Sequence, residues 1–178
     1  MESPKRKPNR LTYYDYSTPG AYFITICVEN RRNILGRIVG GGALDAPQMQ
    51  LSRIGKIVKK YIQSGERVGN IHVDKYVIMP NHIHLILMVE NGVGAGTSRA
   101  PSPTNALIPR FVAALKRLCH KELGEKIFQR SYHDHVIRDE KDYLKIWRYI
   151  DGNPSRWYED CFYVENEADE QCSPLQDG

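Results

Sequence analysis

The longest apolar run of the chain, residues 76–89, is interrupted once, by the polar motif at residues 81–84. Both flanks of the interruption are rich in valine, isoleucine and leucine, which is typical of buried strands. Pro80 and Asn81 break the run and predict a tight turn between two antiparallel strands. The sheet that contains this hairpin is therefore expected to form the core of the fold.

Two histidines, His82 and His84, open the second strand of the hairpin. Because side chains alternate between the two faces of a strand, both imidazoles leave the same face side by side. Adjacent imidazoles suit a single metal ion, so the pair favours a metal-binding or catalytic role. The alternative is a pair of core histidines satisfied by hydrogen bonds.

The remaining elements follow from hydrophobic periodicity and from residues that start or stop helices. In chain order we expect strands at 21–28 and 34–39, a helix at 51–62, hairpin strands at 71–79 and 82–89, a helix at 107–123, a strand at 127–137 and a helix from Asp139 or Glu140 to Gly152. This order predicts the split β-α-β of a ferredoxin-like α+β fold, an antiparallel sheet with helices on one face and an extra C-terminal helix.

The length of 178 residues suits one domain, and the net charge of +4 is compatible with a polyanionic partner. The four cysteines form no Cys-x-x-Cys pair, which argues against zinc-ribbon and disulfide frameworks. The chain contains no secretory signal and no apolar run of membrane length, so we expect a cytoplasmic protein without a membrane partner.

Three segments lack periodicity and are expected to be poorly ordered. Residues 1–12 form a basic, flexible arm, either solvated or in contact with DNA. Residues 91–105 are rich in glycine, serine and proline and predict a mobile loop. Residues 159–178 predict an acidic tail.

Two motifs in a fixed order resemble a known family. Residues 76–84 resemble the His-hydrophobic-His signature of the IS200-like single-tyrosine (HUH) transposases, most closely their REP-associated branch. Residues 149–154, preceded by 131–140, are similar to the closing segment of that family, which carries the nucleophile. The resemblance spans residues 13–158 and implies the same ferredoxin-like fold.

The last helix singles out one of the eleven tyrosines. With a turn of about 100° per residue, Tyr149 falls on a polar stripe with Asp142, Lys145 and Asn153, whereas Tyr143 falls on the apolar stripe. The nucleophile of the family matches Tyr149, four residues before the Asn-Pro pair. The alternative for Tyr149 is a rim aromatic with its hydroxyl in water.

Asn153 lies one turn beyond Tyr149 on the same stripe. The resemblance places a helix-borne third metal ligand, often glutamine, at this position, which makes Asn153 the candidate ligand. Two alternatives stay open: a water molecule takes this place, or Asn153 caps the helix before Pro154.

The resemblance implies a transposase that cleaves and rejoins single-stranded or hairpin DNA, with palindromic repeats as targets of the REP-associated branch. Tyr149 would form a covalent 5′-phosphotyrosine, and His82, His84 and Asn153 would hold Mg²⁺ or Mn²⁺. Candidates for contacts with the DNA backbone are Arg31, Arg32, Lys56, Lys59, Arg110, Arg117, Arg130 and Arg138. A homodimer is one option and a monomer the other. The expected location is the bacterial cytoplasm, in association with the nucleoid.

Two other functions remain open. One is a catalytically inactive nucleic-acid-binding regulator of the same fold. The other is a metal-dependent phosphodiester hydrolase that uses the histidine pair to activate water, with His133, Asp134 or His135 as a further ligand.

Overall fold

A computed structural model describes residues 18–41, 45–65, 67–68, 70–90 and 106–164 of the chain. The expected arm at residues 1–12 and the expected loop at 91–105 lie outside the described residues. The same holds for residues 165–178 of the expected acidic tail.

The order of elements follows the expected pattern with short additions. The elements are β1 (Gly20–Cys27), the 3-10 turn η1 (Glu29–Arg31), β2 (Gly36–Val39), β3 (Gln48–Leu51), α1 (Arg53–Ser64), β4 (Arg67–Val68), β5 (Ile71–Ile78), β6 (His82–Val89), α2 (Leu107–Leu123), β7 (His133–Ile137), α3 (Glu140–Gly152) and the 3-10 segment η2 (Pro154–Glu159).

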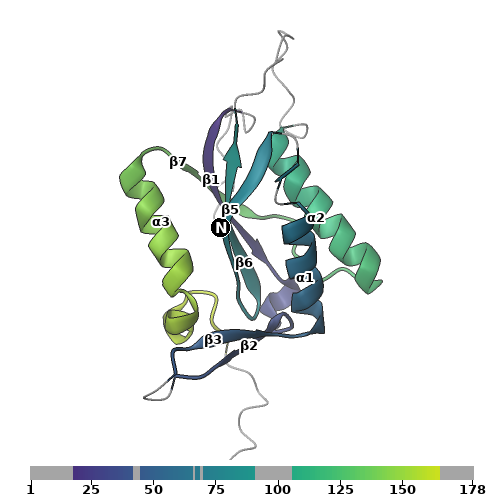
Figure 1. The fold of residues 1–178 in the computed structure, drawn as a ribbon. Coiled ribbons are helices and arrows are strands. Elements are labelled where there is room, and N and C mark those ends of the chain that lie inside the picture. The colour runs from purple at the N-terminus through teal and green to yellow at the C-terminus, as the bar shows by residue number, and fades with distance from the viewer. Residues whose placement is uncertain (1–17, 42–44, 66, 69, 91–105, 165–178) are drawn as a thin grey trace, which may run out of the picture.

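The main sheet is antiparallel and has the strand order β4-β5-β6-β1-β7 (Figure 1). β6 pairs with β5 on one side and with β1 on the other, so it separates the two strands that α1 connects. This is the predicted split β-α-β, and the ferredoxin-like α+β fold is confirmed. β2 and β3 form a separate two-stranded ribbon, of which the sequence predicted only the first strand.

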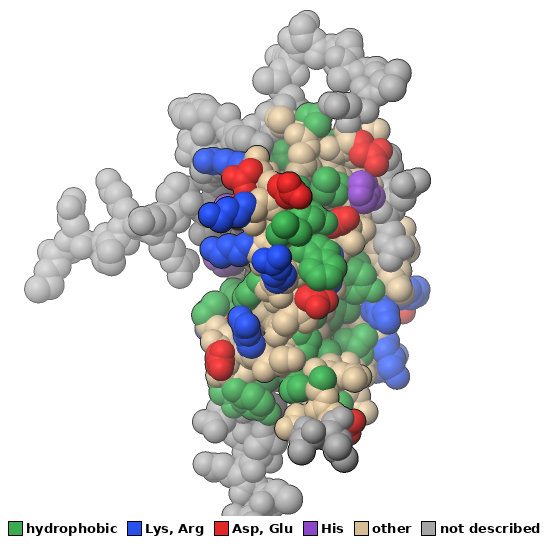
Figure 2. Space-filling view, turned by 60° about the vertical axis from the view of Figure 1, so that its left-hand side comes forward, with side chains coloured by type: hydrophobic (Ala, Val, Ile, Leu, Met, Phe, Trp, Pro, Cys, Tyr) green, Lys and Arg blue, Asp and Glu red, His purple; other side chains and the backbone are tan. Residues whose placement is uncertain are grey.

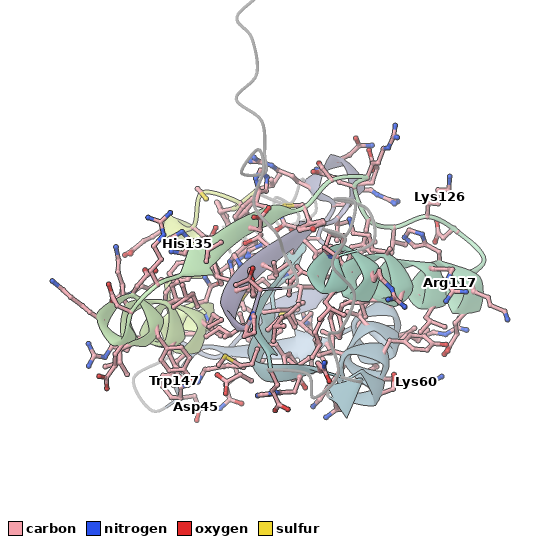
Figure 3. The ribbon with its side chains drawn as sticks, turned by 90° about the horizontal axis from the view of Figure 1, so that it is seen from above. Asp45, Lys60, Arg117, Lys126, His135 and Trp147 are labelled. Atoms are coloured by element: carbon pink, nitrogen blue, oxygen red, sulfur yellow. The ribbon has the colours of Figure 1, made fainter. Side chains whose placement is uncertain are left out.

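Helices cover both faces of the sheet. α1 and α2 lie on one face and α3 on the other, which the view from above shows clearly (Figure 3). Ile83, Leu85 and Leu87 of β6 belong to the core under α1 and α2, whereas Ile86 packs with Ile146 of α3. The prediction that helices cover one face is therefore correct for α1 and α2. The extra C-terminal helix, α3, packs on the opposite face. β6 is buried on both sides, which explains its nearly continuous apolar sequence.

Side-chain hydrogen bonds shift two of the expected boundaries. α1 begins at Arg53, later than expected, because Leu51 pairs with Gly36 in the ribbon and Ser52 caps the helix by accepting from Gly55 N at 3.1 Å. β7 begins only at His133. Just before β7, the Lys116 ammonium group donates to the carbonyls of residues 129–131 at 2.8, 3.3 and 2.9 Å. These carbonyls therefore bond a side chain rather than a neighbouring strand.

The turn between β5 and β6 is fixed by contacts with distant segments. Leu35 N donates to Pro80 O at 2.9 Å, and Ser52 N donates to Leu35 O at 2.9 Å. Gly55 of α1 packs against the same Leu35 carbonyl, so closely that a Cβ there would overlap the oxygen. The first turn of α1 therefore supports the turn that precedes the histidine pair.

We predict that Gly55→Ala destabilises the protein by about 1–3 kcal/mol, because its methyl group displaces the Leu35 backbone. Gly152→Ala, at the end of α3, is the matched control, since nothing lies within 4 Å of its added Cβ. The control should be neutral or up to about 1 kcal/mol more stable. Urea unfolding of both variants measures the difference. Equal stabilities would contradict the packing described for α1.

Candidate active site

The two histidines meet as the strand pattern predicts. His82 and His84 stand on the side of β6 that faces α3, and their Nε2 atoms are 3.0 Å apart. Both imidazoles are buried, with exposed fractions of 0% and 1%. Phe162, Trp157 and Tyr149 contribute rings to their surroundings.

The hydrogen bond at the Nδ1 atom of each imidazole bears on which ring nitrogen carries the hydrogen. Asn81 Nδ2 donates to the carbonyls of Arg31 and Phe162, which fixes the orientation of the amide. Its Oδ1 must then accept from His82 Nδ1 at 2.9 Å, so His82 Nε2 is left with a lone pair. His84 Nδ1 lies 2.8 Å from Thr25 Oγ1, a hydroxyl that can either donate or accept.

Burial keeps both imidazoles neutral. It lowers the pKa of His82 to about 3, with the positive charge of Arg31 as the second cause. Burial also lowers the pKa of His84 well below its ordinary value, followed by the effect of His82. Neutral imidazole is the form that binds metal ions.

Tyr149 is the tyrosine that α3 brings to this pair. Its hydroxyl lies 3.3 Å from His84 Nε2, and its ring centre lies 5.2 Å from that of His84. The side chain is 40% exposed, so it forms the boundary between the histidines and solvent. Burial, followed by the charge of Asp160, raises the pKa of Tyr149 to about 12. Tyr143 instead packs with the apolar cluster under α3 and donates to Asp74 at 2.6 Å.

Asn153 also reaches the site. It follows the last turn of α3, where its backbone N–H donates to Ile150 O, and its side chain is buried. Its Nδ2 donates to Asp160 Oδ2 at 3.1 Å, and its buried Oδ1 has no hydrogen-bond partner among the described residues. Asn153 therefore both ends α3 and lies near the histidine pair, two positions that the sequence analysis gave as alternatives.

Asp160 is a site residue that the sequence analysis missed. Its Oδ2 lies 4.0 Å from His82 Nε2 and 3.4 Å from the Tyr149 hydroxyl, and its side chain is 3% exposed. The sequence placed it in an acidic tail, but residues 159–164 are described and lie at the site. One available signal was its position among aromatic residues, Trp157, Tyr158, Phe162 and Tyr163, which suit a packed segment better than a tail.

A short segment, residues 160–164, closes the site and is called the strap below. Its backbone carbonyls accept from Asn81 Nδ2 at 2.8 Å, from Arg31 Nη1 at 3.3 Å and from Asn33 Nδ2 at 3.0 Å. The ring of Phe162 lies 4.6 Å from that of His82, centre to centre. The strap and Tyr149 together separate the histidine pair from solvent.

The side chains present fit a divalent cation. His82, His84 and Asp160 each offer one ligand atom, and these atoms all lie within 4.8 Å of one another. Two ligands at right angles around an octahedral ion lie about 3.0 Å apart, which is the separation of the two Nε2 atoms. Imidazole nitrogen suits Mn²⁺ and later transition metals better than Mg²⁺. Within the described residues, His133, Asp134 and His135 do not join this group.

The basic residues proposed for DNA contacts fall on different sides of the molecule. Arg31 and Arg32 lie beside the strap, and the Arg31 guanidinium stands 5.5 Å from the centre of the Phe162 ring. Lys56 and Lys59 of α1 and Arg110 and Arg117 of α2 belong to the opposite face, and Arg130 and Arg138 flank β7. All of these side chains are exposed.

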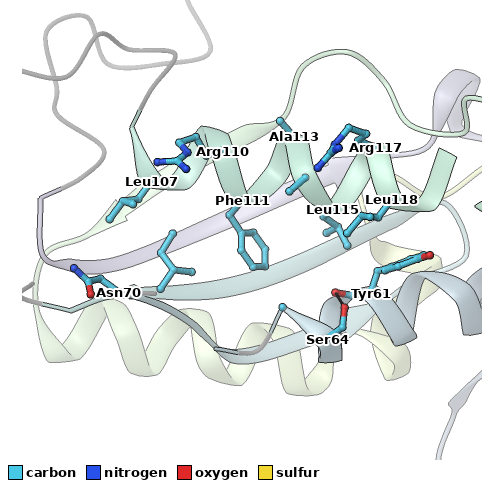
Figure 4. Close-up of a pocket in the computed structure, with 13 residues that line it drawn as sticks. Tyr61, Ser64, Asn70, Leu107, Arg110, Phe111, Ala113, Leu115, Arg117 and Leu118 are labelled. Atoms are coloured by element: carbon cyan, nitrogen blue, oxygen red, sulfur yellow. Dashed lines mark hydrogen bonds between the residues drawn. The ribbon is translucent and has the colours of Figure 1, made fainter. Parts of the chain in front are cut away.

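Each face also has a surface feature of its own. On the side of α3, Lys and Arg side chains follow one edge and apolar side chains gather in the middle (Figure 2). The exposed apolar residues of α3 are Leu144, Trp147 and Tyr149. On the other face, a groove of about 750 Å³ runs between α1 and α2, with Phe111 inside it and Arg110 and Arg117 along it (Figure 4).

Comparison with solved structures defines the class of fold. The chain superposes on a REP-associated tyrosine transposase bound to a REP hairpin with a TM-score of 0.56 and 21% identity, over 88% of this chain and 74% of that one. The expected resemblance to the REP-associated, IS200-like transposases is thus confirmed for the fold.

Comparison of sequences places the chain in a family. It is 35% identical over 182 residues to an uncharacterized protein of Haemophilus influenzae (strain ATCC 51907 / DSM 11121 / KW20 / Rd), covering 90% of this chain and 94% of that protein. The chain belongs to the same family as this protein. No family model matches the sequence. Among the helices described, none has the length and apolarity needed to cross a bilayer.

We predict that Asn81→Ala lowers the free energy of unfolding by about 2–4 kcal/mol, because it leaves the buried His82 Nδ1 and two partly buried carbonyls without this partner. The strap should also become more susceptible to limited proteolysis. Asn70→Ala, at an exposed position, is the control and should change stability by less than about 0.5 kcal/mol. A loss below about 1 kcal/mol for Asn81→Ala would contradict its role as a link between His82 and the strap.

Proposed function

We propose that the chain is a metal-dependent transposase that cleaves and rejoins single-stranded or hairpin DNA through a covalent bond to Tyr149. The observation that carries the proposal is the position of the Tyr149 hydroxyl, 3.3 Å from His84 Nε2 and on the open side of the histidine pair. The fold shared with a transposase bound to a REP hairpin supports the same conclusion.

His82 and His84 would hold Mg²⁺ or Mn²⁺ through their facing Nε2 atoms. When bound, this cation would neutralise charge on the non-bridging oxygens of the scissile phosphate and align it for attack. Asn81 and Thr25 keep the two rings in place through the opposite nitrogens, which preserves the angle between the ligands.

Tyr149 would act as the nucleophile. Its Oη forms a bond to phosphorus while the bond from phosphorus to the 3′-oxygen breaks, which leaves a 5′-phosphotyrosine and a free 3′-hydroxyl. The phenol loses one proton and the departing 3′-oxygen gains one, so charge is balanced. Because its pKa is raised to about 12, the phenol is neutral near pH 7 and requires nearby positive charge as the new bond forms. The covalent link retains the energy needed for rejoining.

The burial of the histidines means that the site must open before a phosphate can reach them. Tyr149 is the most exposed side chain around the pair, and the strap is held mainly by hydrogen bonds to its backbone carbonyls. Movement of Tyr149 and of strap residues 161–164 would admit a DNA strand from the side of α3 while the sheet stays intact.

The DNA would require contacts beyond the site. Arg31 and Arg32 are the basic residues placed to hold phosphates next to the scissile one. The α1–α2 face provides a second basic surface, since α1 carries Arg53 and three lysines and no acidic residue. Tyr149 meets the histidines of its own chain, which favours a monomer that is competent alone over a dimer that shares its sites.

We predict that Tyr149→Phe abolishes the covalent adduct, because the ring remains but the attacking oxygen is lost. The test incubates labelled hairpin DNA with the full chain and Mn²⁺ and separates the products on a denaturing gel. Tyr143→Phe is the matched control on the same helix and should still form the adduct, since its hydroxyl bonds Asp74 away from the histidines.

The same gel separates the rival functions. Strand cleavage that survives in Tyr149→Phe without an adduct would indicate a hydrolase, for which Asp160 provides an acidic ligand beside the pair. DNA binding by the wild-type chain on a native mobility-shift gel, with neither cleavage nor adduct on the denaturing gel, would indicate an inactive regulator.

We further predict that His82→Ala and His84→Ala each slow Mn²⁺-dependent cleavage by at least ~100-fold, since a lost metal ligand removes several kcal/mol of transition-state stabilisation. His135→Ala, an exposed histidine bonded to Asp142, should retain normal rates. Cleavage that continues unchanged in excess chelator would reject the role of the cation.

A further inference from the structure

The carboxylate of Asp160 is buried and has no Lys or Arg partner within the described part of the chain. Its side chain is 3% exposed, and the only ion-pair contact recorded for it among the described residues is His82 Nε2 at 4.0 Å. At this distance His82 makes no hydrogen bond to the carboxylate. A carboxylate buried in this way is costly unless a cation lies against it or a metal ion binds it.

The hydrogen bonds of Asp160 direct one oxygen toward the histidines. Oδ1 accepts from Phe162 N at 2.7 Å, within the strap. Oδ2 accepts from Asn153 Nδ2 at 3.1 Å and from the Tyr149 hydroxyl at 3.4 Å. Oδ2 is also the atom that lies 4.0 Å from His82 Nε2, so the bond from Asn153 holds this carboxylate oxygen toward the lone pair of His82.

From this arrangement we propose that Asp160 is the third protein ligand of the divalent cation and that Asn153 is a positioning residue for it. The proposal rests on the metal site of the proposed function and puts Asp160 in place of Asn153, the third ligand that the sequence analysis expected. The amide N–H₂ of Asn153 points at the carboxylate, and an amide carries no charge. Asp160 offers a carboxylate oxygen, the type of ligand that Mg²⁺ and Mn²⁺ prefer.

The assignment has a consequence for the strap, because Asp160 begins it. A cation bound to His82, His84 and Asp160 would join β6 to the strap directly, in addition to the bond from Asn81 Nδ2 to Phe162 O. Tyr149, which is 40% exposed, lies between this group of ligand atoms and solvent.

The test measures Mn²⁺ binding by the metal-free full chain, without DNA, using calorimetry together with the electron paramagnetic resonance signal of free Mn²⁺. The wild-type chain should bind one ion. Asp160→Asn, which keeps the shape of the side chain and removes its charge, should weaken Mn²⁺ binding by at least ~100-fold. Asn153→Ala should weaken it by only ~10-fold, because Asn153 bonds the ligand rather than the ion. Asp151→Asn, an exposed aspartate paired with Lys75, is the matched control and should bind as the wild type does.

Thermal unfolding with and without Mn²⁺ shows whether each variant is folded. We expect Mn²⁺ to raise the Tm of the wild type and of Asp151→Asn but not that of Asp160→Asn. If Asp160→Asn fails to fold, the test compares the Mn²⁺ affinities of Asp160→Glu and Asp160→Ala. Asp160→Glu retains a carboxylate and should bind Mn²⁺ more tightly.

Wild-type affinity in Asp160→Asn, a larger loss in Asn153→Ala than in Asp160→Asn, or no Mn²⁺ binding by the wild type would each overturn the proposal. Because no DNA is present, the result is independent of transposition. A wild-type chain that binds Mn²⁺ through Asp160 and forms no adduct would leave this assignment standing and remove the proposed function.

Discussion

The contact between two neutral imidazoles, His82 Nε2 and His84 Nε2 at 3.0 Å, sets the conditions for the rest of the site. Only one of two facing neutral nitrogens can carry a hydrogen, so each ring depends on a partner at its other nitrogen. Asn81 provides this partner for His82 and Thr25 provides it for His84. Buried polar groups require hydrogen-bond partners, so the bonds made through Thr25 and Asn81 connect β1, β6 and the strap around the histidine pair.

The parts of the site that sequence predicted are those set by local periodicity. The two-residue repeat of a strand places His82 and His84 together, and the 3.6-residue repeat of a helix separates Tyr149 from Tyr143. The fold follows from the same periodicities, because the element order leaves few arrangements of the strands. The sequence did not predict that α3 packs on the face of the sheet that carries the histidines, opposite α1 and α2.

The parts that sequence missed depend on contacts between distant residues. Asp160 lies in an acidic stretch without periodicity, and only its bonds to Asn153 and its distance to His82 make it a site residue. β3 forms because its four residues pair with β2, and β7 is shortened because Lys116, from α2, occupies the preceding carbonyls. Such pairings have no signal in the local sequence.

The assembly of nucleophile and histidines within one chain has a consequence for stoichiometry. In the part of the chain that the structure describes, one tyrosine, Tyr149, lies beside the histidine pair. Under the proposed function, one molecule can therefore keep only one DNA end covalently at a time. Exchange of two ends would then demand either two molecules meeting on the DNA or two successive turnovers by one, with the first end released before the second is captured.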